Sequence, residues 1–252
     1  MSRTTTTRAL ALLGLVLAWQ LAASLGPWPP HVLPGPLRVV ASLFDGIRDG
    51  SIVSGVGVSL RRLALGYGLS SIAGIALGIA MGQSATIDRM LGTLIAGLQP
   101  LPSICWMPLA LLWFGLNESA ILFVVVLATL GTVSLAVRDA VLAIPRLWVR
   151  AARNMGLSGY RLWRRVLLPA ALPGTITGLR IGWSYAWRAL MAGELLFVAG
   201  GLGQVMHVGR ELGDMPRVMA AMVSIVILGL AFDNLLLGSV EKRMRQRWGL
   251  VR

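Results

Sequence analysis

The sequence has very little of the chemistry that enzymes and metalloproteins usually depend on. Its 252 residues include one cysteine, two histidines and ten acidic residues. Because Cys105 is alone, no intrachain disulfide can form. His31 and His207 lie far apart in the sequence and have no partners at metal-ligand spacing. No nucleophile–base pair is evident either, so we expect no catalytic residue, no metal and no bound cofactor in this chain.

The sequence also lacks a nucleotide-binding loop. Lys242 is its only lysine, and the residues before it read Gly-Ser-Val-Glu. A phosphate-binding loop of the form G-x-x-x-x-G-K-[ST] needs a glycine directly before the lysine and a hydroxyl residue directly after it. The chain therefore has no ATP site of the usual kind, and any ATP and magnesium would belong to a separate subunit.

Long apolar runs are what the sequence has in abundance. Hydrophobic residues make up 56% of the chain and charged residues 13%, and a helix needs about 20 apolar residues to cross a bilayer. We expect an all-α integral membrane protein with about six transmembrane helices. The expected spans are approximately Ala9–Leu25, Leu63–Met81, Leu91–Trp113, Ala120–Val137, Ile176–Val198 and Val218–Val240. An uncleaved anchor is favoured over a cleaved signal peptide for the first span, because it is long and "GPWPP" follows it.

The basic residues indicate an orientation rather than a nucleic-acid partner. The net charge is +13, but the arginines lie mostly in short segments between apolar runs, where lipid headgroups and the positive-inside rule explain them. Most basic residues, from Arg3 to Arg252, fall on one side if the amino terminus is cytoplasmic. Both termini and the loop 138–170 are therefore expected to face the cytoplasm.

Arg61 and Arg62 fit this orientation poorly, because they fall on its outer side. We interpret Pro36–Arg62 as an amphipathic segment on the outer membrane surface. The expected organisation is an anchor helix with this external segment at 1–62, followed by a core of five spans at 63–252.

The segment from Pro145 to Pro169 predicts two short helices joined by a turn. Pro145 can occupy the first helical position, and Gly156 can end that helix in a left-handed conformation. Ser158 can cap a second helix, which Pro169 would end by removing a donor. Periodicity alone favours a basic loop lying on an anionic leaflet.

The spacing within this segment resembles a known family motif. The chain reads Arg150-Ala151-Ala152-x3-Gly156-x9-Val166-x-Leu168-Pro169, which is similar to the EAA motif of ATP-binding-cassette (ABC) importer permeases, E-A-A-x3-G-x9-I-x-L-P. Every spacing matches, with arginine at the place of the glutamate and valine at the place of the isoleucine. The stretches "LQPLPSICWMPLALLWFGL" and "LLPAALPGTITGLRIGWSYAWRALMAGELLF" resemble the nitrate, sulfonate and taurine branch of that family.

The resemblance implies a type I ABC importer permease fold in the bacterial inner membrane. By resemblance, the permease works as a homodimer or as a pair with a related permease, two cytoplasmic ABC ATPase subunits dock on its coupling helix, and an external solute-binding protein delivers the solute. The solute would be small and anionic or sulfonate-like, such as nitrate, taurine or an alkanesulfonate. The residues expected to couple to the ATPase are Arg150, Ala151, Ala152, Met155, Gly156, Leu157, Ser158, Leu168 and Pro169.

Two features of the apolar runs leave alternatives open. Pro100, Pro102 and Pro108 interrupt the third span, which indicates either a structural kink or a lined pathway. Gly74, Gly78 and Gly82 form a small-residue stripe, which suits packing within the subunit or a dimer interface.

Charged residues at membrane depth are the other candidates for a pathway, because such charges need a partner, water or substrate. Arg180, Ser184 and Arg188 share one helix face. Arg180 lies close enough to the expected membrane edge to reach water. Arg188 either lines an anion pathway or pairs with Glu194 or Asp233, and Glu194 would have to come from another helix or subunit. The candidate pathway residues are Arg188, Ser184, Glu194, Pro102 and Pro108.

The alternative class of protein is a self-contained secondary transporter or channel. Such proteins usually contain inverted repeats and several ionisable groups near the membrane midplane. The sequence has no convincing repeat and few such groups, so we favour the ABC permease.

Overall fold

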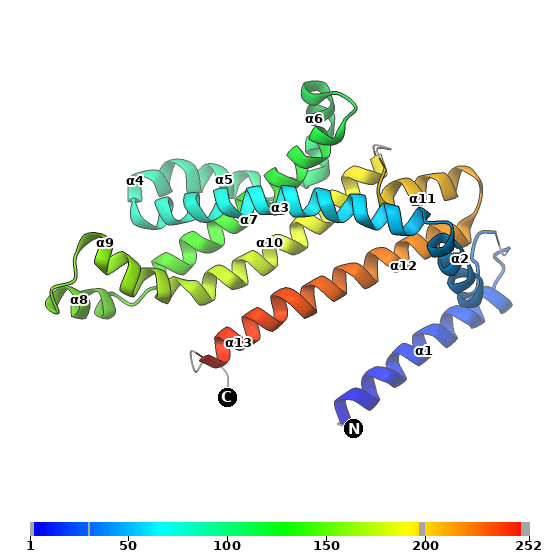
Figure 1. The fold of residues 1–252 in the computed structure, drawn as a ribbon, viewed down its shortest axis with the longest axis horizontal. Helices are drawn as coiled ribbons and strands as arrows, with labels where there is room; N and C mark the ends of the chain where they lie inside the picture. The colour runs from blue at the N-terminus through cyan, green and yellow to red at the C-terminus, as the bar shows by residue number, and fades with distance from the viewer. Residues whose placement is uncertain (1–2, 30, 197–199, 248–252) are drawn as a thin grey trace. The chain divides into compact units, whose positions relative to one another are not determined.

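The computed structural model describes residues 3–29, 31–196 and 200–247, and every regular element in these residues is a helix (Figure 1). Val198, the expected end of the fifth span, and Arg252 lie outside the described residues. The chain divides into two compact units, residues 1–59 with 198–227 and residues 60–197 with 228–252. Each unit is described by itself.

The first unit contains α1 (Arg3–Leu25), α2 (Pro36–Arg48), the start of α3 (Ser51–Gln83), α11 (Leu202–Glu211) and the first part of α12 (Met215–Phe232). Helix α2 is amphipathic, with Leu37 and Phe44 exposed and Val39 buried. A turn at Gly50, which has a φ of 77°, separates α2 from α3. Residues 51–62 therefore start a long helix, whereas we expected one amphipathic segment to continue from Pro36 to Arg62. The expected division after residue 62 falls inside α3.

The second unit is built on close contacts of α7 (Glu118–Leu142) with α3 and α10 (Leu168–Leu196). A Cβ atom at Gly78 of α3 would lie 2.5 Å from the backbone oxygen of Ser134, and one at Gly178 of α10 would lie 2.5 Å from Cβ of Ala136. Only glycine permits such close approach of the helix backbones. The small-residue stripe of α3 thus packs on α7 within the subunit.

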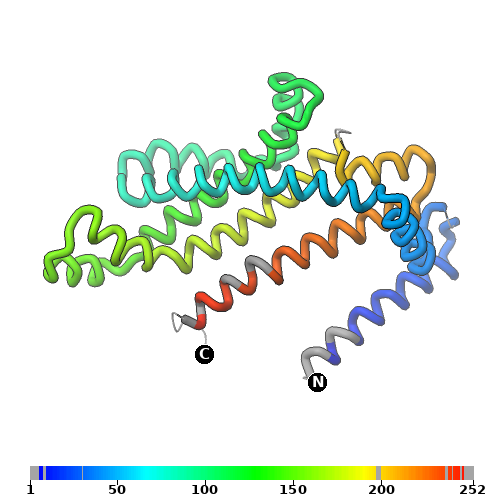
Figure 2. Tube along the Cα trace, viewed as in Figure 1, coloured from blue at the N-terminus to red at the C-terminus, as the bar shows by residue number. Residues whose placement is uncertain are grey.

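The third expected span is not one continuous helix. Helices α4 (Ala85–Ile87), η1 (Asp88–Gly92) and α5 (Thr93–Leu98) lead to a break, after which η2 (Ser103–Trp106) and α6 (Met107–Phe114) run in a new direction. The two arms are bent by 99°, and Figure 2 shows the sharp turn between them. Pro100 and Pro102 lie in the break, which fits their chemistry: proline cannot donate a helical hydrogen bond and disfavours helix in the residue before it. Pro108 lies in the first turn of α6, where its ring is tolerated.

Length and composition support three membrane-crossing helices in the described residues, namely Ser51–Gln83, Glu118–Leu142 and Met215–Leu235. The bent pair provides a fourth if it counts as one span. Of the other expected spans, α1 has a shorter apolar part, Leu10–Leu25, and α10 carries charged residues along its 29 residues. After α12 the chain continues through η4 (Asp233–Gly238) into α13 (Ser239–Arg247).

Candidate functional site

Residues 145–168, which we call the elbow, connect α7 to α10 in the second unit (Figure 1). Helix α8 spans Arg146–Asn154, and Pro145 is its N-cap rather than its first residue. At its other end Leu157 N donates to Ala152 O at 3.0 Å and Gly156 N donates to Arg153 O at 2.9 Å. This is a Schellman turn, and it requires the left-handed φ of 80° that Gly156 adopts. The expectation that Gly156 ends this helix in a left-handed conformation is confirmed. The four-residue spacing from Ala152 to Gly156 follows from the hydrogen bonds of the Schellman turn.

The second half of the elbow differs from the expectation. Ser158 occupies the N-cap of α9 (Gly159–Leu162), but its side chain makes no capping hydrogen bond. Pro169 does not end this helix, because α9 continues through the π-helical turn η3 (Trp163–Leu167) into α10. A second proline, Pro173, lies inside α10, so proline does not end the helical path in this region. The elbow is therefore continuous with α10.

The outward face of α8 combines apolar and basic side chains. Leu147, Ala151 and Met155 follow one another at intervals of four residues and are exposed, Leu147 by 68% and Met155 by 81%. Ala152 is only 6% exposed, so its side chain packs inward in this chain. The remaining expected coupling residues are Arg150, Gly156, Ser158 and Leu168, which are exposed, and Leu157 and Pro169, which are half-buried. Leu147 was missing from that set, although its spacing from Ala151 and Met155 indicated the same face.

A buried ion-pair cluster joins α3, α7 and α10. Arg62 Nη1 lies 3.0 Å from Glu194 Oε1, and Arg62 Nε lies 3.0 Å from Glu118 Oε1. The exposed Arg61 binds the same Glu118 at 2.7 Å. Arg62 and Glu194 are 2% and 0% exposed. The orientation rule placed Arg62 on the outer surface, and its poor fit to that rule was the only sign of a buried role.

A second cluster joins α10 to η4 and α13. The Arg180 guanidinium makes two hydrogen bonds to Asp233, at 2.9 and 2.7 Å, and one to Glu241 at 2.9 Å. Thr177 Oγ1 donates to the other oxygen of Glu241 at 3.0 Å. Asp233 thus reaches an arginine, which was one of its two expected environments, and Arg180 makes ion pairs on neighbouring segments.

Arg188 has a different environment. Its Nε donates to the Ser184 carbonyl at 3.1 Å, and its Cζ lies 4.6 Å from the centre of the Tyr185 ring. Among the described residues, no carboxylate forms an ion pair with it. Its expected alternative partners, Glu194 and Asp233, bind Arg62 and Arg180 instead.

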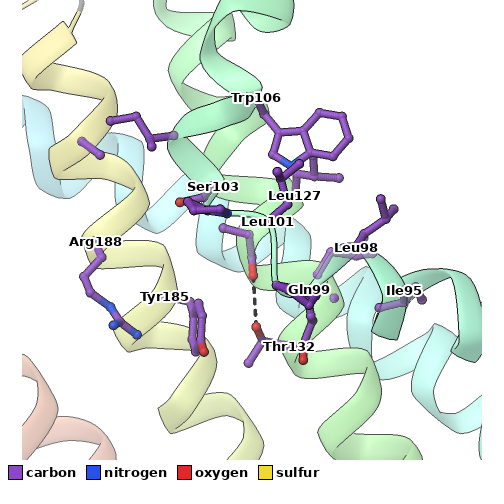
Figure 3. Close-up of a pocket in the computed structure, with 17 residues that line it drawn as sticks. Ile95, Leu98, Gln99, Leu101, Ser103, Trp106, Leu127, Thr132, Tyr185 and Arg188 are labelled. Atoms are coloured by element: carbon purple, nitrogen blue, oxygen red, sulfur yellow. Dashed lines mark hydrogen bonds between the residues drawn. The ribbon is translucent and has the colours of Figure 1, made fainter.

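Arg188 lines a cavity of about 470 Å³ beside the break between α5 and η2. Figure 3 shows Arg188 and Tyr185 on α10, with Gln99 and Ser103 on the α5–η2 segment and Thr132 on α7. Of the candidate pathway residues, the cavity brings together Arg188 and Pro102, whereas Ser184, Glu194 and Pro108 do not line it. Sequence reasoning missed Gln99, Ser103 and Thr132, because single polar residues in apolar runs give no distinctive signal.

Comparison with known proteins identifies the family. The sequence profile of the family described as binding-protein-dependent transport system inner membrane component matches residues 71–246. The taurine transport system permease protein of Escherichia coli is 30% identical over 256 aligned residues, covering 100% of this chain and 93% of that protein. The putative aliphatic sulfonates transport permease protein of the same species is 32% identical over 235 aligned residues, covering 93% and 89%.

A solved structure supports the fold. The MetNI methionine ABC transporter in an inward-facing conformation contains a chain that matches with a TM-score of 0.67 at 21% identity, covering 77% of this chain and 96% of that one. At this identity the likeness concerns the permease fold alone. The chain belongs to the family of binding-protein-dependent transport system inner membrane components, and it is a transport subunit of an ABC importer rather than an enzyme.

Proposed function

We propose that this permease imports a small anionic, sulfonate-type solute, and that separate ATPase subunits drive it through the elbow. The observation that carries the coupling role is the exposed stripe of Leu147, Ala151 and Met155 on α8. An apolar stripe flanked by arginines suits a protein groove better than water. Because α9, η3 and α10 form one continuous helical path, a displacement of the elbow would be passed directly to α10.

The assembly that follows from this proposal contains partners on both faces of the membrane. Two permease chains, identical or related, form the pathway. Two ATPase subunits hold ATP and magnesium, since this sequence has no phosphate-binding loop, and an external binding protein delivers the solute. Both termini and the elbow face the cytoplasm, in agreement with the distribution of basic residues.

The solute class has two lines of support. The two Escherichia coli relatives are named for taurine and for aliphatic sulfonates, and both kinds of compound carry a sulfonate group. In this chain, Arg188 presents a cation to the cavity beside the broken third span. Nitrate is also compatible with a single cation at this place.

The coupling role can be tested with an acidic substitution on the exposed stripe. Met155→Asp should leave folding intact, because Met155 is 81% exposed, but should place a carboxylate in the ATPase groove. We expect assembled complexes of permease, ATPase and binding protein to lose solute-stimulated ATP hydrolysis. The control is Thr86→Asp, an equally acidic change at another exposed position. Full stimulation in Met155→Asp would overturn the coupling role.

A further inference from the structure

Arg188 differs from the other arginines of α3, α7 and α10, three long helices that contribute to the second unit. In α3, α7 and α10, the other arginines all form ion pairs, as shown by Arg61 and Arg62 with Glu118, Arg138 with Asp88, and Arg180 with Asp233. Among the residues that the structure describes, Arg188 has only a carbonyl and an aromatic ring. Arginine stays protonated at any physiological pH. Its charge therefore has no balancing anion within the described part of the protein.

The two contacts of Arg188 hold the side chain without neutralising it. The Ser184 carbonyl accepts from Nε, and the Tyr185 ring lies against the guanidinium carbon. Neither contact uses the donors on the two terminal nitrogen atoms, which form the edge that binds an oxyanion through two parallel hydrogen bonds. The side chain is thus oriented and keeps its anion-binding edge.

The cavity beside Arg188 is both large enough and of suitable chemistry for a small organic anion. Its volume of about 470 Å³ lies in the range of small-molecule sites. Gln99 and Ser103 can donate further hydrogen bonds, and Leu98, Leu127 and Trp106 supply apolar wall. None of the residues that line it is acidic, so an ammonium group would find no counter-charge there.

We propose that this cavity is a selectivity subsite for monoanionic organic oxyanions with a short alkyl tail, with Arg188 binding the oxyanion and the apolar wall receiving the tail. The inference deepens the proposed function and rests on it. A single arginine balances one negative charge, so a dianion such as sulfate would keep an uncompensated charge. Taurine would bring an ammonium group into the apolar part of the cavity. No partner there would compensate for the loss of its hydration.

The inference can be tested by measuring how tightly small anions bind to the permease–ATPase complex in lipid nanodiscs, without the binding protein. Radiolabelled 1-propanesulfonate is the probe, because it replaces the ammonium of taurine by a methyl group and keeps the sulfonate. We expect 1-propanesulfonate to bind at least about 10-fold more tightly than taurine or sulfate, as a site without a partner for a charged group discriminates by about this factor or more. Butanoate, a carboxylate of similar length, should compete with the probe.

The variants assign the effect to Arg188. Arg188→Gln should weaken binding of 1-propanesulfonate by at least about 10-fold, whereas Arg188→Lys should retain part of the affinity. Arg89→Gln is the matched control, because Arg89 is exposed and its Nε also donates to the carbonyl four residues earlier, at 3.1 Å from Ala85 O, but it does not line the cavity. Basal ATP hydrolysis shows that each variant complex is assembled.

Two results would overturn the inference. One is wild-type affinity in Arg188→Gln, and the other is equal or tighter binding of taurine or sulfate by the wild-type complex, which needs no variant. Failure of the proposed coupling role can be distinguished from failure of the subsite, because it would appear as full solute-stimulated ATP hydrolysis in Met155→Asp. A complex that retains solute-stimulated ATP hydrolysis but binds 1-propanesulfonate equally well with Arg188→Gln would refute the subsite alone.

Discussion

The ion pair between Arg62 and Glu194 should contribute strongly to stability. Arg62→Met removes the cation that lies 3.0 Å from a fully buried carboxylate, and removing one partner of a buried pair costs about 3–5 kcal/mol. Glu194→Gln should cost less, about 1–3 kcal/mol, because Arg62 keeps its ion pair with Glu118. We therefore expect the arginine variant to be the less stable of the two.

The neighbouring Arg61 provides the matched control. It binds the same Glu118, but its side chain is 62% exposed, and exposed ion pairs contribute up to about 1 kcal/mol. Arg61→Met should therefore leave the free energy of unfolding almost unchanged. The double variant Arg62→Met/Glu194→Gln should cost less than the two single changes together, by about 0.5–3 kcal/mol, because the two side chains interact.

The assay is reversible unfolding in mixed detergent micelles, with the free energy of unfolding taken from denaturing-detergent titrations followed by circular dichroism. Equal costs for Arg62→Met and Arg61→Met would refute the reasoning, because burial would then make no difference. Strict additivity in the double variant would also refute it, since the two groups would not be coupled.

Three further predictions concern backbone geometry and one surface carboxylate. Gly78→Ala should lower the free energy of unfolding by about 1–3 kcal/mol, because its Cβ would meet α7, whereas Gly68→Ala has nothing within 4 Å and should be neutral or stabilising in the same unfolding assay. Gly156→Ala, at a φ of 80° in open space, should cost about 1–2 kcal/mol through backbone strain alone and should reduce solute-stimulated ATP hydrolysis. Hydrogen bonds from the Ser51 side chain and backbone amide lower the pKa of Asp49 below its ordinary 3.8. The ionised Asp49 carboxylate therefore stabilises the folded protein fully above pH 3.8, and this contribution is lost as the pH falls below that value. Asp49→Asn should abolish this acid dependence in unfolding curves measured against pH.

Local features of the fold could be predicted from the sequence because local chemistry determines them. The left-handed ending at Gly156 follows from the glycine itself, and the small-residue stripe on α3 indicated a close helix contact. These inferences depend on a few neighbouring residues and not on the tertiary structure.

Features that depend on distant residues could not be predicted in the same way. Arg62 and Glu194 are 132 positions apart, and no periodicity links them. The orientation rule counts charges without regard to their partners, so it assigned Arg62 to the surface. The helix continues past Pro169 through the π turn at η3, and proline statistics do not reveal this continuation. The inward packing of Ala152 depends on tertiary contacts that the motif spacing does not specify.

Uptake into liposomes tests the central claim most directly, that a separate ATPase drives this permease through the elbow. The chain would be reconstituted alone, with its ATPase, and with both the ATPase and the binding protein. Each sample would be measured with and without ATP on the side of the membrane that carries the ATPase. The readout is uptake of a radiolabelled sulfonate. The account predicts accumulation only when ATPase, binding protein and ATP are all present. Uptake by the chain alone without nucleotide would contradict it and would indicate a secondary transporter or channel.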